Sequence, residues 1–275
     1  MMKNFIKIFA GFLLAILLIF GSLWLTFPKA NDHFLTQKLS NSRGLSLHYV
    51  ALGDSLTEGV GDATGQGGFV PLFAKKLENA ADHSVSSENF GKAGDTSTQI
   101  YDRMLQQEKI RNGLKKADII TITVGGNDVM KVIRDNVTKL FTMDEKDFVQ
   151  PEQAYQKQVK KLLDTIRKNN PKAEIYVLGI YNPFYVNFPE LTAMQNVINQ
   201  WNKATDEVIS KEKYTYFVPI NDLLYKGMQK TVEADGKADT VGNNLLYTGD
   251  RFHPNNTGYQ IMANAVFESY VKNHQ

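Results

Sequence analysis

Leu45-Ser46-Leu47-His48-Tyr49-Val50-Ala51-Leu52 is a mostly apolar stretch that runs directly into Gly53-Asp54-Ser55-Leu56-Thr57. The first segment is typical of a buried strand, and the second is typical of a tight turn because glycine and aspartate favour turns. A serine in such a turn is where an α/β enzyme presents a nucleophile. Gly-Asp-Ser alone is also an ordinary turn sequence, so its meaning depends on the rest of the chain.

The rest of the chain alternates between strand-like and helix-like patterns. Short runs rich in β-branched and aromatic residues predict strands, and apolar residues at three-to-four spacing predict helices. This alternation predicts an α/β domain with a parallel sheet covered by helices on both faces. The predicted strands are 45–52, 85–90, 118–124, 175–180 and 214–220. The predicted helices are 69–81, a helix that contains Ile100 to Leu105, a helix that contains Val129 to Ile133, 151–169, 191–212 and a helix from Asn256 onward. Ser97 is the predicted N-cap of the second of these helices.

Two further turn-like segments contain side chains that suit chemistry. Val124-Gly125-Gly126-Asn127-Asp128 ends an apolar run, and Asp250-Arg251-Phe252-His253-Pro254 lies close to the C-terminus. Ser55, Gly94 and Asn127 all come just after predicted strand ends, and ligands of open parallel sheets bind beyond those ends. We therefore expect these residues to converge. Together the segments supply a serine, an amide, a carboxylate and an imidazole, which serine-based acyl transfer requires.

The chemistry assigns a role to three of these side chains. Ser55 would attack an ester carbonyl, and His253 would take its proton and later return it to the leaving group. Asp250 lies three residues before His253, so one turn can contain both. Its carboxylate would accept the imidazole N–H, fix the tautomer and stabilise the imidazolium.

Four ordered blocks of the chain resemble the GDSL family of esterases and lipases, also called SGNH hydrolases. The blocks are Ala51-Leu-Gly-Asp-Ser-Leu-Thr-Glu58, Asn89-Phe-Gly-Lys-Ala-Gly-Asp-Thr-Ser97, Val124-Gly-Gly-Asn-Asp128 and Asp250-x-x-His253-Pro254. The order and approximate spacing of all four make the resemblance specific. The Gly-x-Ser-x-Gly motif of α/β-hydrolases is not found in the sequence.

This resemblance implies a three-layer α/β/α sandwich with a flavodoxin-like sheet of five parallel strands. It also implies an oxyanion hole made by the backbone N–H groups of Ser55 and Gly94 and the side-chain amide of Asn127. Gly94 suits that role because a missing Cβ lets the backbone approach a substrate closely.

Each residue alone also has an ordinary structural interpretation. Ser55 and Asn127 are common turn residues, Asp250 is a typical exposed loop acid, and Asp54 and Asp128 are typical caps to which we assign no chemistry. The joint pattern outweighs these readings. The other histidines have no comparable context and are interpreted as surface or structural residues; they are His33, His48, His83 and His274.

Residues 1–28 differ in composition from the rest of the chain. Lys3 and Lys7 precede an uncharged apolar run over 8–27, which has the length that a bilayer-spanning helix needs. A cleaved signal peptide usually has a shorter apolar region of about 7–15 residues. The segment therefore favours an uncleaved transmembrane signal anchor, with the basic end in the cytoplasm. We expect a single-pass membrane protein with a tether over 29–44 and an extracytoplasmic catalytic domain over 45–275, secreted if the anchor is cleaved.

Charge and composition exclude several classes of site. Two of the 31 Lys and Arg residues lie in 1–28, so the remaining 29 balance the 29 acidic residues. That balance argues against a nucleic-acid partner, because phosphate binding depends on excess basic residues. The absence of cysteine excludes disulfides and thiolate metal sites. Asp144-Glu145-Asp147 lacks the spacing of a calcium loop and is interpreted as a solvated loop.

We therefore expect a serine esterase or lipase that hydrolyses acyl esters through an acyl-enzyme on Ser55, without metal or cofactor. Lysophospholipids, other lipid esters, thioesters and O-acetylated sugars are all compatible with the family. Aromatic residues near the predicted rim could line an acyl groove or belong to the core; they are Tyr181, Phe184, Tyr185 and Phe188. Two alternatives are a catalytically silent binding module on the same fold, against which the intact residue set argues, and an acyltransferase that uses the same residues.

Overall fold

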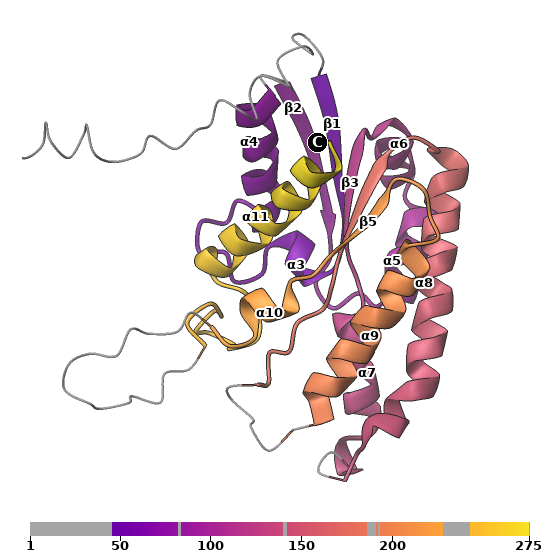
Figure 1. Cartoon of the computed structure of the whole chain (residues 1–275), viewed down its shortest axis with the longest axis vertical. Coiled ribbons are helices and arrows are strands. Elements are labelled where there is room, and N and C mark those ends of the chain that lie inside the picture. Colours follow the sequence, from indigo (N-terminus) through magenta and orange to yellow (C-terminus); the bar gives the residue numbers. More distant parts are fainter. Residues whose placement is uncertain are drawn as a thin grey trace, which may run out of the picture. The chain divides into compact units, whose positions relative to one another are not determined.

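Five strands form one parallel sheet in the order β2-β1-β3-β4-β5 (Figure 1). The computed structural model describes residues 46–81, 84–139, 142–185, 191, 193–227 and 243–274. Every neighbouring pair of strands runs parallel, which confirms the predicted α/β class and the five-stranded sheet. The strands are β1 Ser46–Gly53, β2 Ser84–Gly91, β3 Ile119–Thr123, β4 Glu174–Leu178 and β5 Thr215–Val218.

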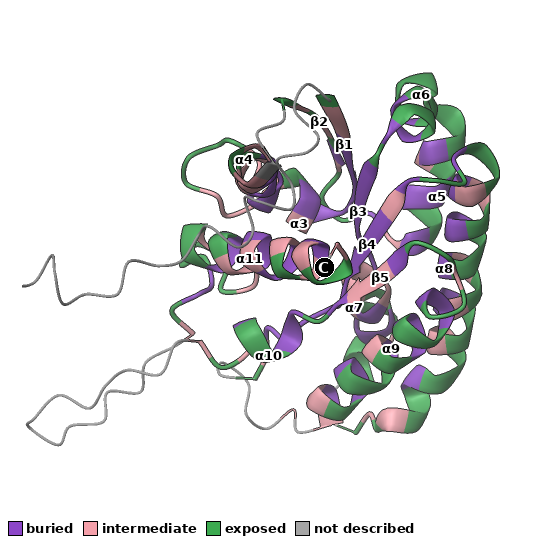
Figure 2. Cartoon of the chain, turned by 45° about the horizontal axis from the view of Figure 1, so that its top comes forward, coloured by how far each residue is buried: buried purple, intermediate pink, exposed green. Residues whose placement is uncertain are grey.

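Helices cover both faces of the sheet and complete the predicted three-layer sandwich. The helices α4 (Phe69–Ala81) and α11 (Asn256–Asn273) lie on one face, with the short α3 (Ser55–Glu58) and α10 (Asn221–Leu224) near them. Figure 2 shows that the central strands, which lie between the two helical layers, are mainly buried. The opposite face carries α5 (Ser97–Gln106), α6 (Glu108–Lys116), α7 (Gly126–Asp135), α8 (Val149–Asn169) and α9 (Ala193–Ile209).

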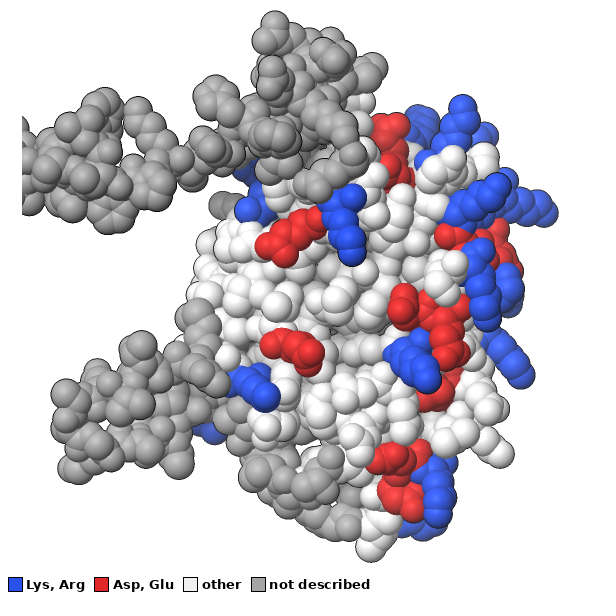
Figure 3. All heavy atoms as spheres, viewed as in Figure 1, with Lys and Arg blue, Asp and Glu red and all other residues white. Residues whose placement is uncertain are grey.

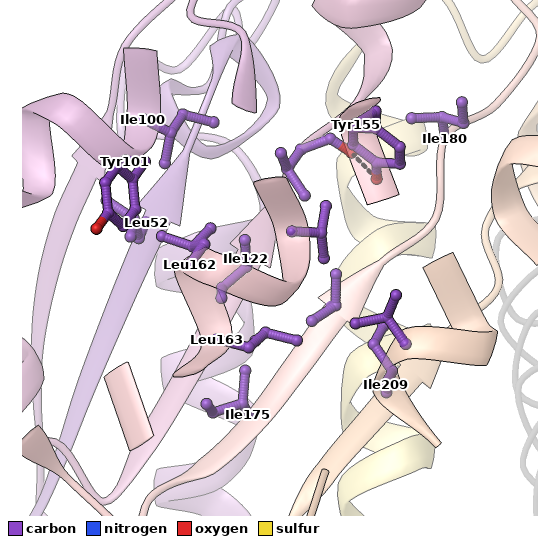
Figure 4. Close-up of a cluster of buried hydrophobic side chains, with 14 of the residues drawn as sticks. Leu52, Ile100, Tyr101, Ile122, Tyr155, Leu162, Leu163, Ile175, Ile180 and Ile209 are labelled. Carbon is purple, nitrogen blue, oxygen red and sulfur yellow. Dashed lines mark hydrogen bonds between the residues drawn. The ribbon is translucent and has the colours of Figure 1, made fainter. Parts of the chain in front are cut away.

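The larger hydrophobic cluster packs the α5–α9 layer against the sheet (Figure 4). Leu52, Ile122 and Ile175 from three adjacent strands meet Leu162 and Leu163 of α8, and all five side chains are buried. Burying one such side chain stabilises the fold by about 1.5–3 kcal/mol. The packing therefore fixes the strands whose carboxyl ends carry the candidate site.

Strand burial explains which strands were easiest to predict. All five residues of β3, Ile119–Thr123, are buried, and a parallel strand covered on both faces reads as a continuous apolar run. The edge strand β2 is instead largely polar, and only one of its residues is buried. Polar residues at a sheet edge reduce its tendency to pair with other chains.

Two helix-cap predictions were wrong. The N-cap of α5 is Thr96, not Ser97, because Thr96 and Gln99 form a reciprocal capping box. Asp128 does not cap α7, whose N-cap is Gly125. Its carboxylate instead accepts hydrogen bonds from the backbone N and the Oγ of Ser97, at 2.9 and 2.6 Å. The short helix α3 and the helices α6 and α10 were not predicted from the sequence.

The acidic segment Asp144-Glu145-Asp147 has a structural role. It begins the 3-10 helix η3 (Glu145–Phe148), in which Asp144 accepts from Lys146 N at 2.8 Å and Asp147 accepts from Asp144 N at 2.9 Å. This capping box uses two of the three carboxylates. Across the ranges that the structure describes, no group of three or more potential metal ligands is placed to hold a metal ion.

Charged side chains of both signs are mixed on the face shown in Figure 3. Lys131–Asp135 and Lys160–Asp164 are exposed pairs of opposite charge one helical turn apart. Such exposed pairs contribute little to stability, because water screens their attraction. They favour solubility more than stability.

The predicted anchor over 1–28 and the tether over 29–44 lie outside the described residues. Within the part of the chain that is described, no helix has the length and apolar character to cross a membrane. The anchor therefore stays a prediction from the sequence.

Candidate active site

The sheet topology selects one edge for a site. The strand order reverses direction between β1 and β3, and ligands of such sheets bind in the crevice beyond the carboxyl ends at this reversal. Ser55 follows β1 by two residues, and Asn127 follows β3 by four. The two residues thus lie at the ends of adjacent strands.

Ser55 begins the one-turn helix α3. Asp54 caps this helix by accepting from Leu56 N at 3.0 Å, and Gly59 ends it with a φ of 93°, which glycine adopts without strain. Ser55 is 7% exposed. The sharp change from strand to helix presents its hydroxyl at the edge of the sheet.

Ser55, His253 and Asp250 form a continuous chain of hydrogen bonds. His253 Nε2 lies 2.8 Å from Ser55 Oγ, and His253 Nδ1 lies 2.6 Å from Asp250 Oδ2. The other Asp250 oxygen accepts from the backbone N of Phe252 at 2.8 Å and of His253 at 3.0 Å. Arg251 between them has a φ of 54°, a left-handed conformation that bends the turn. This arrangement can move a proton between the hydroxyl and the imidazole.

The environment of Asp250 favours its ionised form. Partial burial acts to raise the pKa of Asp250, but the hydrogen bonds from the His253 ring and from backbone N–H groups outweigh that effect and hold it below its ordinary value. A carboxylate that stays charged can orient the imidazole and stabilise an imidazolium.

Gly94 and Asn127 meet at one turn. Lys92 to Asp95 form a β-turn closed by Asp95 N donating to Lys92 O at 3.2 Å, with Gly94 in third position at a φ of 84°. Type II turns require such a residue there. Asn127 Nδ2 donates to Asp95 O at 3.0 Å, which orients the amide. The Gly94 N–H is not the donor of the turn bond and is suited to a ligand oxygen.

The sequence of the chain matches a known family over most of its length. The model of the GDSL-like lipase/acylhydrolase family matches residues 51–261. The chain belongs to this family. It is therefore a member of a family of serine ester hydrolases.

Two curated relatives and two solved structures are similar to this GDSL hydrolase. Uncharacterized protein YpmR of Bacillus subtilis is 33% identical over 81% of this chain and 80% of its own length. Spore germination lipase LipC of Bacillus licheniformis is 30% identical over 80% of this chain and 94% of its own. The lipase Lip_vut3 from a goat rumen metagenome has a TM-score of 0.65 at 27% identity, covering 81% of this chain and 96% of its own. The acetylxylan esterase Axe2 of Geobacillus stearothermophilus has a TM-score of 0.57 at 18% identity, covering 84% of this chain and 95% of its own. This similarity shows that the two proteins share a fold.

A small, mainly apolar cavity lies beside the nucleophile of this GDSL hydrolase. Its volume is about 40 Å³. Tyr181, one of the predicted rim aromatics, lines it and is buried. The other lining residues include Leu56, Val124, Gly126, Asn127, Ile180, Pro183 and Phe252.

The remaining rim aromatics differ in placement. Phe184 packs edge-on against Phe252, with ring centroids 6.1 Å apart. Tyr185 is exposed and packs against Tyr225, with ring centroids 4.7 Å apart. Phe188 lies outside the described residues. Of the predicted rim aromatics, Tyr181 thus lines the cavity, whereas Phe184 packs against the lining residue Phe252.

Two other histidines pair with acids away from the site. His48 Nε2 lies 3.2 Å from Glu88, and His274 Nε2 lies 3.0 Å from Glu174. Both connect surface elements, as expected for structural residues. His33 and His83 fall outside the described ranges.

Sequence reasoning missed the polar groups beneath the site. Thr123 Oγ1, at the end of β3, donates to Asp54 Oδ1 at 2.8 Å and lies 2.7 Å from Thr57 Oγ1. Burial raises the pKa of Asp54. These contacts join residues about 70 positions apart in the chain, and no local sequence pattern indicates them.

Proposed function

We propose that this GDSL hydrolase cleaves carboxylic esters through an acyl-enzyme formed on Ser55. The observation that supports it best is the unbroken chain from Ser55 Oγ through His253 to Asp250, at 2.8 and 2.6 Å. Both distances lie within the hydrogen-bond range that nucleophile and base need.

The reaction runs in two halves. Ser55 Oγ forms a bond to the ester carbonyl carbon while His253 Nε2 takes the hydroxyl proton. The tetrahedral intermediate then collapses, its bond to the alcohol oxygen breaks, and His253 returns the proton to the leaving alcohol. Water repeats the sequence on the acyl-enzyme, with His253 again as base and then as acid, and releases the carboxylic acid and free Ser55.

Asp250 and three donors serve this reaction. Asp250 orients His253 and stabilises its charged form, since its depressed pKa keeps it ionised. The negative oxygen of the intermediate is bound by the backbone N–H groups of Ser55 and Gly94 and by Asn127 Nδ2. The type II turn and the Asp95–Asn127 hydrogen bond support this assignment because they orient two of the three donors in advance.

The cavity favours short acyl groups. A water molecule needs about 10–15 Å³ of such space, so the cavity of about 40 Å³ suits two or three heavy atoms. An acetyl group, which has three heavy atoms, has that size. We therefore place O-acetyl and other short-chain esters ahead of long-chain lipid esters as substrates. A similar protein is named a lipase and a protein of the same fold an acetylxylan esterase.

The same enzyme is proposed to sit on the outer face of a membrane. The support is the basic start at Lys3 and Lys7 followed by the apolar run over 8–27. Full-length protein should sediment with membranes and resist extraction by salt and alkali, whereas a cleaved segment would leave the protein in the soluble fraction.

Ester hydrolysis by residues 29–275 tests the proposal, because residues 42–275 form a compact unit by themselves. The substrates are p-nitrophenyl esters from acetate to palmitate, and the control is Ser55→Ala. We expect the highest rate on acetate or propionate and no turnover by Ser55→Ala. A folded wild-type protein that hydrolyses none of the esters and does not react with a fluorophosphonate would favour the binding module.

A further inference from the structure

One arginine joins three separate segments beneath the candidate site. Arg103, on α5, donates from Nε to Asp95 Oδ2 at 2.8 Å, from Nη1 to Phe90 O at 2.9 Å and from Nη2 to Gly53 O at 2.9 Å. Gly53 ends β1 two residues before Ser55, and Phe90 lies near the end of β2. All three nitrogens of the guanidinium are therefore used as donors.

The Arg103–Asp95 pair is the most buried ion pair among the described residues. Its side chains are 10% and 6% exposed, whereas other pairs have at least one side chain far more exposed. The desolvation cost of a buried ion pair offsets much of the attraction between its charges, so such a pair adds little to the stability of the fold. Its location between the nucleophile strand and the Gly94 turn indicates another role.

The turn that bears Gly94 is held at three points. Arg103 binds the Asp95 carboxylate, Asn127 donates to the Asp95 carbonyl, and the Glu58 carboxylate accepts from the backbone N of Ala93. A Cβ built on Gly94 would meet no atom within 4 Å. The turn is thus anchored from below while Gly94 itself borders open space.

We propose that Arg103 is a positioning residue that sets the distance between the Gly94 N–H and Ser55. It binds the strand end that leads to Ser55 and, through Asp95, the turn that presents Gly94. This inference rests on the proposed esterase mechanism, in which those groups contact the same reacting carbonyl. Arg103 itself lies beneath the site and does not touch the substrate.

The planar fork of arginine is needed for this task. A lysine ammonium keeps the charge but acts as a single point, so it cannot reproduce three donors in fixed directions. Arg103→Lys should therefore hold Asp95 and release one or both strand ends. Misplacing a catalytic group by about 1 Å can reduce the rate about 100-fold.

Arg167 offers a matched control at the other end of the sheet. Its guanidinium donates to Ala173 O, just before β4, and to Tyr214 O and Thr215 Oγ1 at the start of β5. Arg167→Lys therefore removes a similar fork from strand ends that lie opposite the site. Its effect measures what loss of such bonds does through stability alone.

The test measures the rate constant for fluorophosphonate reaction with Ser55, in which the Oγ–P bond forms as fluoride leaves and His253 takes the proton. This reaction places a phosphoryl oxygen among the same donors and requires no turnover. We expect Arg103→Lys to lower this constant and the kcat on p-nitrophenyl acetate about 10- to 100-fold. KM should change less than about threefold. Arg167→Lys should stay within about twofold of wild type for each constant, and the melting temperatures of both variants show how much stability each has lost.

Several results would overturn the inference. One is a folded Arg103→Lys protein with wild-type labelling, and another is an equal loss of labelling in Arg167→Lys. If Arg103→Lys does not fold, Asp95→Asn keeps the arginine and weakens its hold on the turn, and unchanged labelling there would also refute the role. A wild-type protein that is labelled on Ser55 but hydrolyses no ester would reject the esterase proposal and leave the labelling comparison valid.

Discussion

Replacing Asn127 by alanine tests the oxyanion donors most directly. Asn127 Nδ2 carries two hydrogens, and one of them bonds to Asp95 O at 3.0 Å. Asn127 also lines the cavity beside Ser55, so its second hydrogen remains for a ligand oxygen. Alanine removes both donors and adds no bulk, so the variant loses the amide without introducing a clash.

The expected effects on rate and on stability differ greatly. Loss of one oxyanion donor reduces kcat about 100- to 1,000-fold, which corresponds to about 2.7–4 kcal/mol of transition-state stabilisation. Loss of the hydrogen bond to Asp95 lowers the free energy of unfolding by about 1 kcal/mol. The donor acts on charge that develops only in the transition state, so KM should change less than about threefold.

Asn136→Ala is the matched control. Asn136 lies at the other end of α7, where its Nδ2 donates to Val132 O at 2.9 Å. It therefore loses one side-chain hydrogen bond to a backbone carbonyl, as Asn127→Ala does. The assay compares kcat and KM on p-nitrophenyl acetate and the urea unfolding of both variants with wild type.

A folded Asn127→Ala protein that keeps more than about one-tenth of wild-type kcat would refute the role of the amide as an oxyanion donor. An equal loss of kcat in Asn136→Ala would also refute that role, because the effect would then follow from stability. A rise in KM with unchanged kcat would mean that the amide binds the ground state and the transition state equally.

Three further predictions follow from other parts of the structure. Asp250→Asn should lower kcat about 100- to 10,000-fold, because His253 loses its orienting carboxylate; an almost unchanged kcat would mean that a Ser–His dyad suffices. Hydrogen bonding to Glu174 raises the pKa of His274, so its stabilisation is present below about pH 6.5 and is lost as pH rises through the higher folded pKa. His274→Gln should thus lower the free energy of unfolding, measured with urea, by under about 1 kcal/mol at pH 6 and by less at pH 9. A larger loss at pH 9 than at pH 6 would contradict the pairing of His274 with Glu174. Gly91→Ala should lower the free energy of unfolding by about 1–3 kcal/mol or prevent folding, because the added Cβ would lie 2.0 Å from a backbone nitrogen of α3. An unchanged melting temperature would contradict that clash.

The sheet and the candidate nucleophile were predictable for the same physical reason. Parallel strands buried on both faces are short apolar runs, so β1 and β3 are evident in the sequence. The residues directly after such runs lie at one edge of the sheet. Ser55 and Asn127 therefore had a predictable position before any contact was known.

The supporting contacts were not predictable because they are long-range. Arg103 reaches Gly53 across 50 positions, and Asn127 reaches Asp95 across 32. Neither residue differs locally from an exposed helix arginine or a turn asparagine. Thr96 and Gln99, by contrast, form a local capping box that the sequence did contain and that Ser97 obscured.

Three aspartates adjacent to the candidate functional residues show why sequence motifs identify these residues but do not give their relative positions. Asp54 precedes Ser55 and accepts from Thr123 at the end of β3. Asp95 follows Gly94 and holds Arg103, which binds the end of β1. Asp128 follows Asn127 and accepts from Ser97, beside the Gly94 turn.

Each of these carboxylates therefore binds a residue outside its own turn. Turns at separate strand ends are joined only through the sheet, and a shift of about 1 Å between donors is enough to impair catalysis. Asp128 connects the Asn127 turn to the segment after Gly94, and Asp54 connects the nucleophile turn to the end of β3. Asp95 reaches the end of β1 through Arg103. Since aspartate beside a turn is also an ordinary cap, the sequence could not separate these cross-links from local caps. The functional atoms of this site are thus specified by short motifs, whereas their relative placement depends on the acidic neighbours within those same motifs.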